Sequence, residues 1–442
     1  MPVKKTAPLP ADLAFLRSAR AVLSRKFPAK EGYALFLRAA HTRSLGKELY
    51  AGRTLSKREE VLGAHADVVD RKGRLATLRV GSGNVAAVKA ACAHFDPAAF
   101  VAVPGSYSVK PVAKGNFPRK GALPARAVET EYRALLAACK KRLTTEGARR
   151  GVAFKLENLG VTVDSSSESY WSSAGGECRQ DLSPRFSVGG EIMAQWKGKK
   201  DDGYFSFTSA RVDRDGALRE IDEALDEAAQ AVRKPRGAYE RVRGNVRIDA
   251  KLFMELLGEL EDHLSVRWAK EGMSLALGKD MAQKADFSPL LSVDLVAQDG
   301  TAFDRLLTDK GKPVEDKALL KYGKVAHPLA GEDDLDKYRW PAKKACVGQP
   351  VTRVVPGPGD ITDAQTDFFL LRLNALHNLN AQTLEMNLTG SGFVLEKGKR
   401  RFSSNLVLKC NLLDIFRGLE KVGKTVRRQH DWSCPDVLVR LA

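Results

Sequence analysis

Two residues near the C-terminus, His430 and Cys434, have the chemistry to share a metal ion or a thiol site. An imidazole nitrogen and a thiolate are both zinc ligands, and a catalytic zinc takes about three protein ligands and one open position for water. A nucleophilic Cys–His pair would need a third orienting group and a thiol of lowered pKa. The chain contains seven His and six Cys, which makes such proximity unsurprising, and a structural role is favoured for this pair.

Several classes of site and location are disfavoured by the sequence. The six cysteines form no CxxC pair, which is typical of reduced thiols in a cytosolic protein. The serines at 165–167 and the glycines at 175–176 are not followed by the GxxxxGK[ST] pattern of a phosphate-binding loop. No apolar run approaches the roughly eighteen residues of a membrane span, and the N-terminal segment lacks the continuous apolar stretch of a secretory signal. We therefore expect a cytoplasmic protein without membrane contact.

The net charge of +18 would attract polyanions, acidic peptides or an acidic partner subunit. Basic clusters lie at residues 197–200, 397–401 and 424–428, and they are interpreted as solvated faces, with a charged rim for acidic peptide or nucleic acid as the alternative. Aromatic residues make up only 7% of the chain, so the stacking residues of a single-strand binder are missing. A generally basic surface is the preferred interpretation.

The length of 442 residues predicts two or three domains, and the pattern of elements predicts an α+β fold. Residues 1–96 are expected to form an N-terminal α/β domain with helices at 11–27 and 85–95 and antiparallel strands at 33–40, 63–69 and 74–80. Prolines recur between 97 and 126, which predicts a linker or an extended arm.

Residues 127–236 are expected to form a central α/β domain, and residues 237–442 a β-rich C-terminal domain. The central elements are helices at 128–144 and 217–232 and strands at 152–157, 161–163, 177–187, 191–196 and 204–209. In the last domain, Asp249 is predicted to cap a helix that runs to about Leu264. Strands are predicted at 289–296, 351–355, 368–373, 383–388, 392–396, 404–409 and 437–441, with a last helix at 412–422.

Three stretches together resemble the TldD/PmbA family, whose founding members were named as modulators of DNA gyrase. They are residues 203–211 with the helix after them, residues 250–277, and the C-terminal run made of 390–398, 411–416 and 422–423. The resemblance implies an N-terminal α/β region, a central segment and a β-rich C-terminal domain in which two subunits enclose a chamber.

The resemblance also implies where chemistry should be. A zinc peptidase of this family is expected to carry HExxxH on a helix, with a cysteine from the C-terminal region as a further ligand. The matching window is residues 258–263, where Glu259 and His263 are in register while Gly258 replaces the first histidine. Glu259 would then be the general base, His263 a vestigial metal ligand and Cys434 a remote ligand. Glycine has no side chain to donate, so no zinc is expected, and Glu259 and His263 are interpreted as polar residues of an amphipathic helix.

The leading hypothesis is a catalytically degenerate family subunit, closest to the members that lack HExxxH. It would form a chamber as a homodimer, or as a heterodimer with a zinc-bearing TldD-like subunit, and would hold unfolded or acidic peptide, with strand addition at a sheet edge as one mode. The first alternative is an active metallopeptidase with a zinc site rebuilt from His263, Glu259 and a C-terminal His or Cys. The second is a basic protein associated with nucleic acid, whose binding would weaken steeply with salt.

Overall fold

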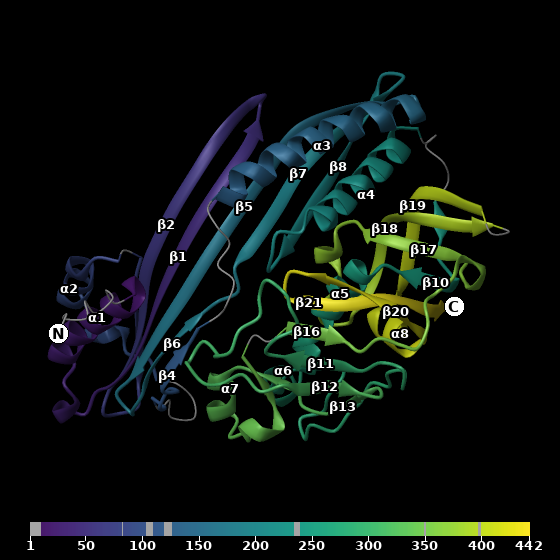
Figure 1. Cartoon of the computed structure of the whole chain (residues 1–442). Helices are drawn as coiled ribbons and strands as arrows, with labels where there is room; N and C mark the ends of the chain where they lie inside the picture. Colours follow the sequence, from purple (N-terminus) through teal and green to yellow (C-terminus); the bar gives the residue numbers. More distant parts are fainter. Residues whose placement is uncertain are drawn as a thin grey trace.

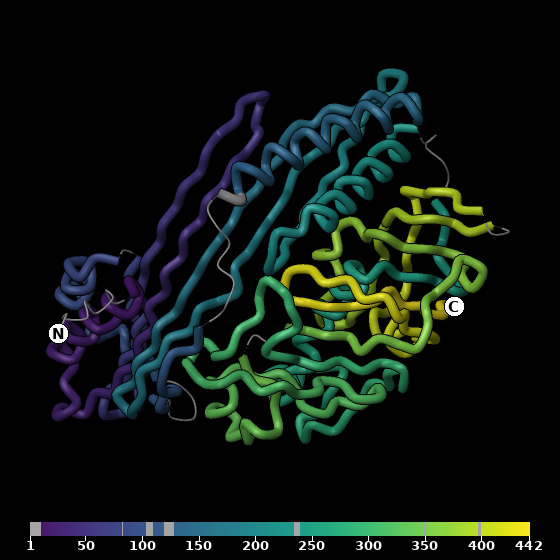
Figure 2. Tube along the Cα trace, in the orientation of Figure 1, coloured from purple at the N-terminus to yellow at the C-terminus, as the bar shows by residue number. Residues whose placement is uncertain are grey.

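The chain folds into two units, each built around one large sheet (Figure 1). The structure is a computed structural model, and it describes residues 10–81, 83–102, 109–118, 126–233, 239–348, 351–396 and 399–442. The purple-to-teal part of the chain forms the first sheet and its helices, and the part from teal-green to yellow forms the second unit (Figure 2). The fold is α+β, as predicted.

The first sheet contains four long strands, β1 (Ala34–Tyr50), β2 (Arg53–Val69), β5 (Ala153–Ser172) and β7 (Arg185–Trp196). It is completed by shorter strands, β3 (Leu75–Val80), β4 (Gly115–Phe117), β6 (Glu177–Asp181) and β8 (Lys199–Ser209). The strand order is β3-β2-β1-β5-β6-β4, and β7 lies between β5 and β8. Because β1 pairs with β5 from Phe36↔Ser172 to Tyr50↔Asn158, segments 1–96 and 127–236 share one sheet.

Two helix pairs cover this sheet. The long helices α3 (Arg126–Arg150) and α4 (Arg214–Arg233) pack on β5, β7 and β8. The shorter helices α1 (Ala11–Lys26) and α2 (Val85–Ala93) pack on β1, β2 and β3. Each pair buries the apolar stripe that its sequence predicts, because apolar residues three or four apart lie on one side of a helix. No described helix combines the length and the apolarity that crossing a bilayer requires.

The second unit is an 11-stranded sheet with α5 (Ala250–Glu261) and α8 (Leu412–Arg417) against it. Its strand order is β13-β12-β11-β16-β21-β10-β17-β18-β19-β9, and β20 pairs with β21. The strands are β9 (Glu240–Arg241), β10 (Gly244–Ile248), β11 (Val293–Val296), β12 (Lys317–Lys321), β13 (Lys324–Val325), β16 (Val351–Val354), β17 (Phe368–Leu373), β18 (Glu385–Glu396), β19 (Lys399–Asn411), β20 (Leu419–Gln429) and β21 (Trp432–Leu441). A two-stranded sheet, β14 (Leu329–Ala330) and β15 (Cys346–Val347), lies beside α6 (Val266–Glu271) and α7 (Glu332–Lys337).

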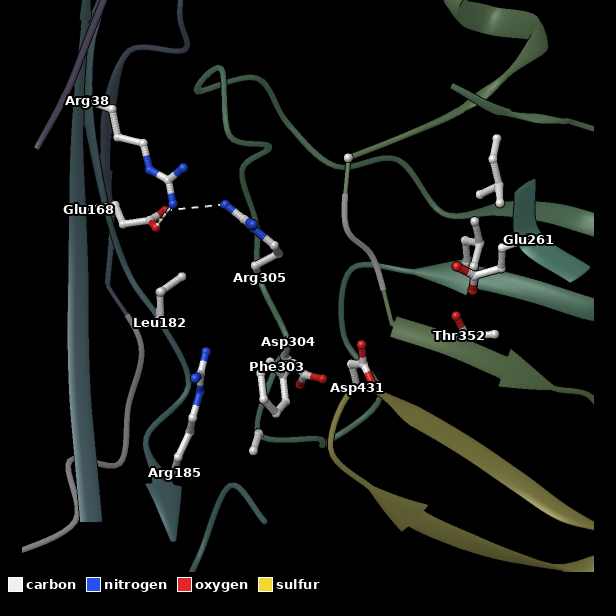
Figure 3. A pocket seen from close by; sticks show the side chains of 14 residues that line it. Arg38, Glu168, Leu182, Arg185, Glu261, Phe303, Asp304, Arg305, Thr352 and Asp431 are labelled. Carbon is white, nitrogen blue, oxygen red and sulfur yellow. Dashed lines mark hydrogen bonds and ion pairs between the residues drawn. The ribbon is translucent and has the colours of Figure 1, made fainter. Parts of the chain in front are cut away.

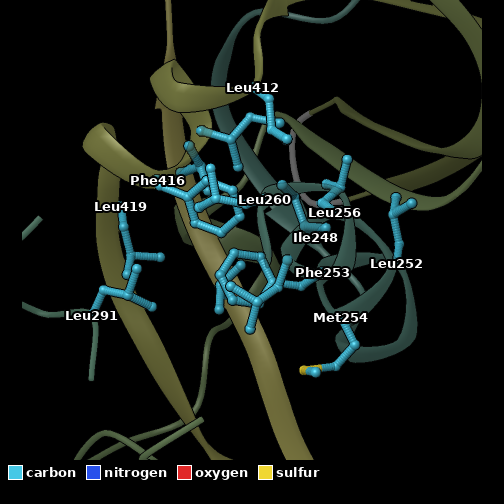
Figure 4. Close-up of a cluster of buried hydrophobic side chains, with 14 of the residues drawn as sticks. Ile248, Leu252, Phe253, Met254, Leu256, Leu260, Leu291, Leu412, Phe416 and Leu419 are labelled. Carbon is cyan, nitrogen blue, oxygen red and sulfur yellow. The ribbon is translucent and has the colours of Figure 1, made fainter. Parts of the chain in front are cut away.

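Helix α5 is the centre of the second core. The Asp249 side chain accepts a hydrogen bond from the Lys251 N–H at 2.9 Å, which confirms the predicted N-cap. Phe253 packs against Phe416 of α8, with ring centroids 5.4 Å apart (Figure 4). The apolar residues of α5 are thus fixed on both sides, and the helix end at Glu261 is held in one place.

Two glycines in the stretches that resemble the family lie against the backbone of a neighbouring element. A Cβ atom on Gly203 of β8 would lie 2.3 Å from the Ala224 carbonyl oxygen of α4. One on Gly392 of β18 would lie 2.0 Å from the Phe369 carbonyl oxygen of β17. Both distances are far inside van der Waals contact, so only glycine fits at these two positions.

The structure corrects several predicted elements. The strands predicted at 33–40 and 63–69 are only the inner parts of 17-residue strands. The separate strands predicted at 152–157 and 161–163 are one strand, β5. The helix predicted at 412–422 ends at Arg417, because the chain from Leu419 onward pairs with β21. Parts of the predicted linker at 97–126, and the whole of the predicted domain boundary at 236–237, lie outside the described residues.

A half-buried arginine joins the two units beside α5. The guanidinium of Arg427 on β20 contacts the carboxylates of Glu220 and Glu223 on α4, and its Nη1 lies 3.3 Å from Asp249 Oδ2. Burial raises the pKa of Asp249 to about 6, although Arg427 opposes that shift. The cap of α5 is thereby tied to a helix of the first unit.

Candidate functional site

His263, the predicted vestigial ligand, lies just after α5 with only 1% of its surface exposed. Its Nδ1 accepts a hydrogen bond from the Leu275 N–H at 3.0 Å, and its Nε2 lies 2.9 Å from the Ala381 carbonyl oxygen. An N–H only donates and a carbonyl only accepts, so the ring is the neutral tautomer with its proton on Nε2. Burial is the main cause that lowers the pKa of His263, which also favours the neutral ring. In this arrangement neither ring nitrogen has a lone pair free for a metal ion.

The other two positions of the window lie on α5 itself. A Cβ atom on Gly258 would meet nothing within 4 Å, so the helix surface is open where the resemblance places a histidine. Glu259, the predicted general base, is half-buried and makes no hydrogen bond or ion pair with the residues that the structure describes. The window therefore presents a carboxylate without a facing imidazole.

Cys434 and His430 lie in different surroundings. Cys434 on β21 is fully buried in the core of the second unit, and its thiol donates to the Pro435 carbonyl oxygen at 3.1 Å. That burial raises the pKa of Cys434 far above its ordinary value, so the thiolate needed for metal binding or nucleophilic attack is disfavoured. His430 lies in the turn between β20 and β21, with its ring 6.3 Å from that of Phe303.

Within the described parts of the chain, no three His, Cys, Asp or Glu side chains converge as a metal site would require. The zinc ion that the resemblance implies does not fit the donors present, because His263 is turned to the backbone and Cys434 is a buried thiol.

Beside the end of α5 lies a cavity of about 480 Å³ between the two units (Figure 3). The first unit contributes Arg38 from β1, Glu168 from β5 and Arg185 from β7. The second contributes Glu261 from α5 and Asp431 from the β20–β21 turn. The remaining lining residues are Leu182, Leu295, Ala302, Phe303, Asp304, Arg305, Leu329, Gly348 and Thr352.

Glu168 organises the first wall of this cavity. It is 4% exposed, and its carboxylate is ion-paired with Arg38 and, at 3.3 Å, with Arg305 of the second unit. The Tyr170 hydroxyl and, at 3.0 Å, the Gln180 amide also donate to it. Both arginines reach a second carboxylate, Asp309, at 3.1 and 3.0 Å. The network balances its charges and joins the two sheets.

Arg185 differs from the other arginines of the cavity. Its guanidinium lies 4.0 Å from the centroid of the Phe303 ring, a cation–π contact. It makes no hydrogen bond or ion pair with any described residue, although Asp164, Glu168 and Asp431 act on it through space. Burial lowers the pKa of Arg185, but an arginine stays charged at neutral pH. The cavity thus contains a cation without a bonded counter-ion.

Glu261 gives the opposite side of the cavity an acidic character, and Asp431 lies between Glu261 and the arginines (Figure 3). Neither side chain is bonded to a cation among the described residues. The Glu261 residue is exposed to the cavity, but the surrounding protein displaces part of its hydration, and this loss of hydration, with Asp431 and Asp262 nearby, raises its pKa to about 7. Near neutral pH this carboxyl is therefore partly protonated.

The raised pKa predicts how Glu261→Gln changes the pH dependence of stability. Between the ordinary pKa of 4.5 and about 7, the folded protein holds a proton on Glu261 that the unfolded chain releases. The native chain therefore loses stability as pH rises through this window, whereas the glutamine variant lacks this contribution. Urea unfolding gives the difference in unfolding free energy between the variant and the native chain. This difference should favour the variant more at pH 8 than at pH 5. The same difference at pH 5 and pH 8 would contradict the raised pKa of Glu261.

The 258–263 window contains one residue that lines the cavity, and it is not the residue predicted to act as general base. The sequence pattern selected Glu259, whereas the structure places Glu261, two residues later, in the cavity. Arg38, Glu168 and Arg185 come from three different strands and carry no motif, so only the strand register brings them together. The one available signal was the position of Glu261 inside the 258–263 window.

The two sheets with their covering helices define an α+β protein. Residues 242–442 match the family model described as the PmbA/TldA metallopeptidase C-terminal domain. The C-terminal part of the chain, residues 242–442, is therefore a domain of the PmbA/TldD type.

Solved structures share this fold over nearly the whole chain. A candidate modulator of DNA gyrase from Thermotoga maritima superposes with a TM-score of 0.76 at 14% identity, covering 97% of this chain and 99% of its own. A second candidate modulator of DNA gyrase, from Bacteroides thetaiotaomicron, has a TM-score of 0.70 at 14% identity, covering 98% and 97%. TldE from Thermococcus kodakarensis has a TM-score of 0.71 at 12% identity, covering 98% and 99%. No curated protein matches the sequence.

Proposed function

We propose that this chain is a non-hydrolytic subunit of the TldD/PmbA family that binds peptide in the cavity between its two units. The observation that carries the proposal is the pair of backbone hydrogen bonds on His263, which leaves no imidazole nitrogen for a catalytic metal. A chamber subunit that holds peptide without cutting it needs the shape and charge of the cavity but not a nucleophile. Six cysteines without a disulfide support a cytoplasmic location as part of the proposal.

The rival function is hydrolysis by a rebuilt zinc site, and a cleavage assay separates the two. An unfolded, acidic peptide is incubated with the chain, with and without added zinc or a chelator, and its mass is followed over time. We expect the peptide to be retained by the protein and to stay intact under all conditions. Chelator-sensitive cleavage that disappears in His263→Ala would overturn the proposal in favour of an active metallopeptidase.

We also propose that the chain forms a homodimer in which the second copy contacts the outer edge of β2. Successive side chains of a strand point to opposite faces of the sheet. Because all residues from 53 to 61 are exposed, both faces of this part of β2 are open to solvent. Outside β2, β3 covers only residues 64–69, so the stretch before them has no described strand neighbour on that side. Leu55 and Val61 are 50% and 44% exposed there, which is unfavourable for an edge strand in water.

A charged substitution at this edge tests the assembly. In sedimentation velocity at tens of micromolar, we expect the native chain to be a dimer and Leu55→Lys/Val61→Lys to be a monomer with an unchanged unfolding midpoint. The matched control is Lys57→Gln on the same strand, which should remain dimeric. A native monomer would contradict self-association, and capture of a zinc-bearing relative from the source cell would then identify a heteromer.

A further inference from the structure

The cavity between the two units carries opposite charges on its two sides. Arg38 and Arg185 stand on one side and Glu261 on the other, with Asp431 between them (Figure 3). Resting on the proposed function, we propose that this cavity binds a short zwitterionic peptide, with its carboxylate against Arg185 and its ammonium group against Glu261 and Asp431. The ligand class is thus a free peptide of two or three residues and not the middle of a long chain.

Arg185 is the cation available for a carboxylate. Arg38 and Arg305 share Glu168 and Asp309, so their charges are already compensated. Arg185 has the Phe303 ring on one face and no bonded carboxylate among the described residues, which leaves its N–H donors for a ligand. A guanidinium binds a carboxylate through two parallel hydrogen bonds, so an incoming C-terminus matches it in charge and in shape.

Glu261 and Asp431 are the acceptors available for an ammonium group. They come from the end of α5 and from the β20–β21 turn, and each lacks a bonded cation among the described residues. Two neighbouring carboxylates repel each other, and a cation placed between them removes that repulsion. Asp304, a further carboxylate of the lining, is different because it accepts hydrogen bonds from the backbone at 299–301.

The size of the cavity limits the ligand. A volume of about 480 Å³ corresponds to about sixteen waters at the liquid value of about 30 Å³ each. That is within the range of small-molecule sites and accommodates a peptide of two or three small residues. The ammonium and carboxylate groups of such a peptide lie two or three residues apart. This arrangement matches a cavity with arginines on one side and Glu261 on the other.

Three peptides test the inference on the native protein by isothermal titration calorimetry at pH 8, where Glu261 is mostly ionised. They are trialanine, N-acetyl-trialanine and trialanine amide, which differ only in their terminal charges. We expect trialanine to bind and each cap to weaken binding at least ten-fold. Equal affinity for all three peptides, or no binding of trialanine, would overturn the inference.

Two variants assign the ends of the ligand. Arg185→Gln should abolish the difference between trialanine and its amide while keeping the penalty for acetylation. Glu261→Gln/Asp431→Asn should show the opposite pattern. Arg211→Gln and Glu255→Gln, two exposed positions outside the cavity, are the matched controls and should bind like the native chain.

The outcomes also separate this inference from the proposed function. Intact binding of a long peptide, with no effect of the terminal charges of trialanine, would refute the zwitterion site and leave a non-hydrolytic subunit. Cleavage of the long peptide would refute the proposed function even if the three titrations behave as expected.

Discussion

Glu168→Ala is expected to lower the free energy of unfolding by about 3–5 kcal/mol, because it leaves a buried arginine network without its central carboxylate. Glu168 is 4% exposed, and its carboxylate is ion-paired with Arg38 and Arg305. It also accepts hydrogen bonds from Tyr170 and Gln180. Urea unfolding followed by circular dichroism measures the change. Because Arg305 belongs to the second unit, we also expect the two units to become more accessible to protease at their junction.

Glu157→Ala on the same strand is the matched control. Glu157 pairs with Lys155 at 2.8 Å, but both side chains are partly or largely exposed, so the change should be below about 1 kcal/mol. A loss of less than about 1 kcal/mol for Glu168→Ala would show that the network does not hold the two units together.

His263→Ala is expected to cost about 2–4 kcal/mol of unfolding free energy without any effect on metal content. The substitution leaves the Leu275 N–H and the Ala381 carbonyl unpaired and opens a void beside Trp268, whose ring centroid lies 4.8 Å from that of His263. The native chain should also lose stability as pH falls below 6.5, since the unfolded chain takes up a proton that the buried ring resists. The alanine variant should lack that pH dependence.

Chemical unfolding between pH 5 and pH 8 measures both effects, and Glu259→Gln on α5 is the control. Glu259 is half-buried and unbonded to described residues, so its substitution should change stability by less than about 0.5 kcal/mol. A His263→Ala variant as stable as the native chain would contradict the structural role of this imidazole.

The helices were predictable because their signals are local. Asp249 followed by apolar residues at helical spacing predicted α5 and its cap, and both are confirmed. The outer halves of β1 and β2 were missed because residues 41–62 show no regular alternation of apolar and polar side chains, with β1 mostly half-buried there and β2 exposed. The end of α8 was misplaced because Leu419 and Val422 fit a helical stripe, whereas pairing with β21 makes that segment a strand.

The candidate site was predictable only in part, because the contacts that shape it come from residues far away in the sequence. The glycine at 258 and the histidine at 263 are visible in the sequence, but the hydrogen bonds that occupy His263 come from residues 275 and 381. The Arg185 side chain reaches the cavity because β7 pairs with β5, and Asp431 reaches it through a hairpin turn. These contacts depend on strand register and on packing between the units, which no local motif encodes.

Zinc stoichiometry in Gly258→His, measured beside the native chain by equilibrium dialysis, shows whether the hydrogen bonds of His263 exclude a metal ion. The new side chain enters open space on α5 and restores the HExxxH pattern, so the variant should fold. Since both nitrogens of His263 remain hydrogen-bonded to the backbone, we predict that neither protein retains zinc at micromolar free metal. One tightly held zinc per chain, in either protein, would contradict the account.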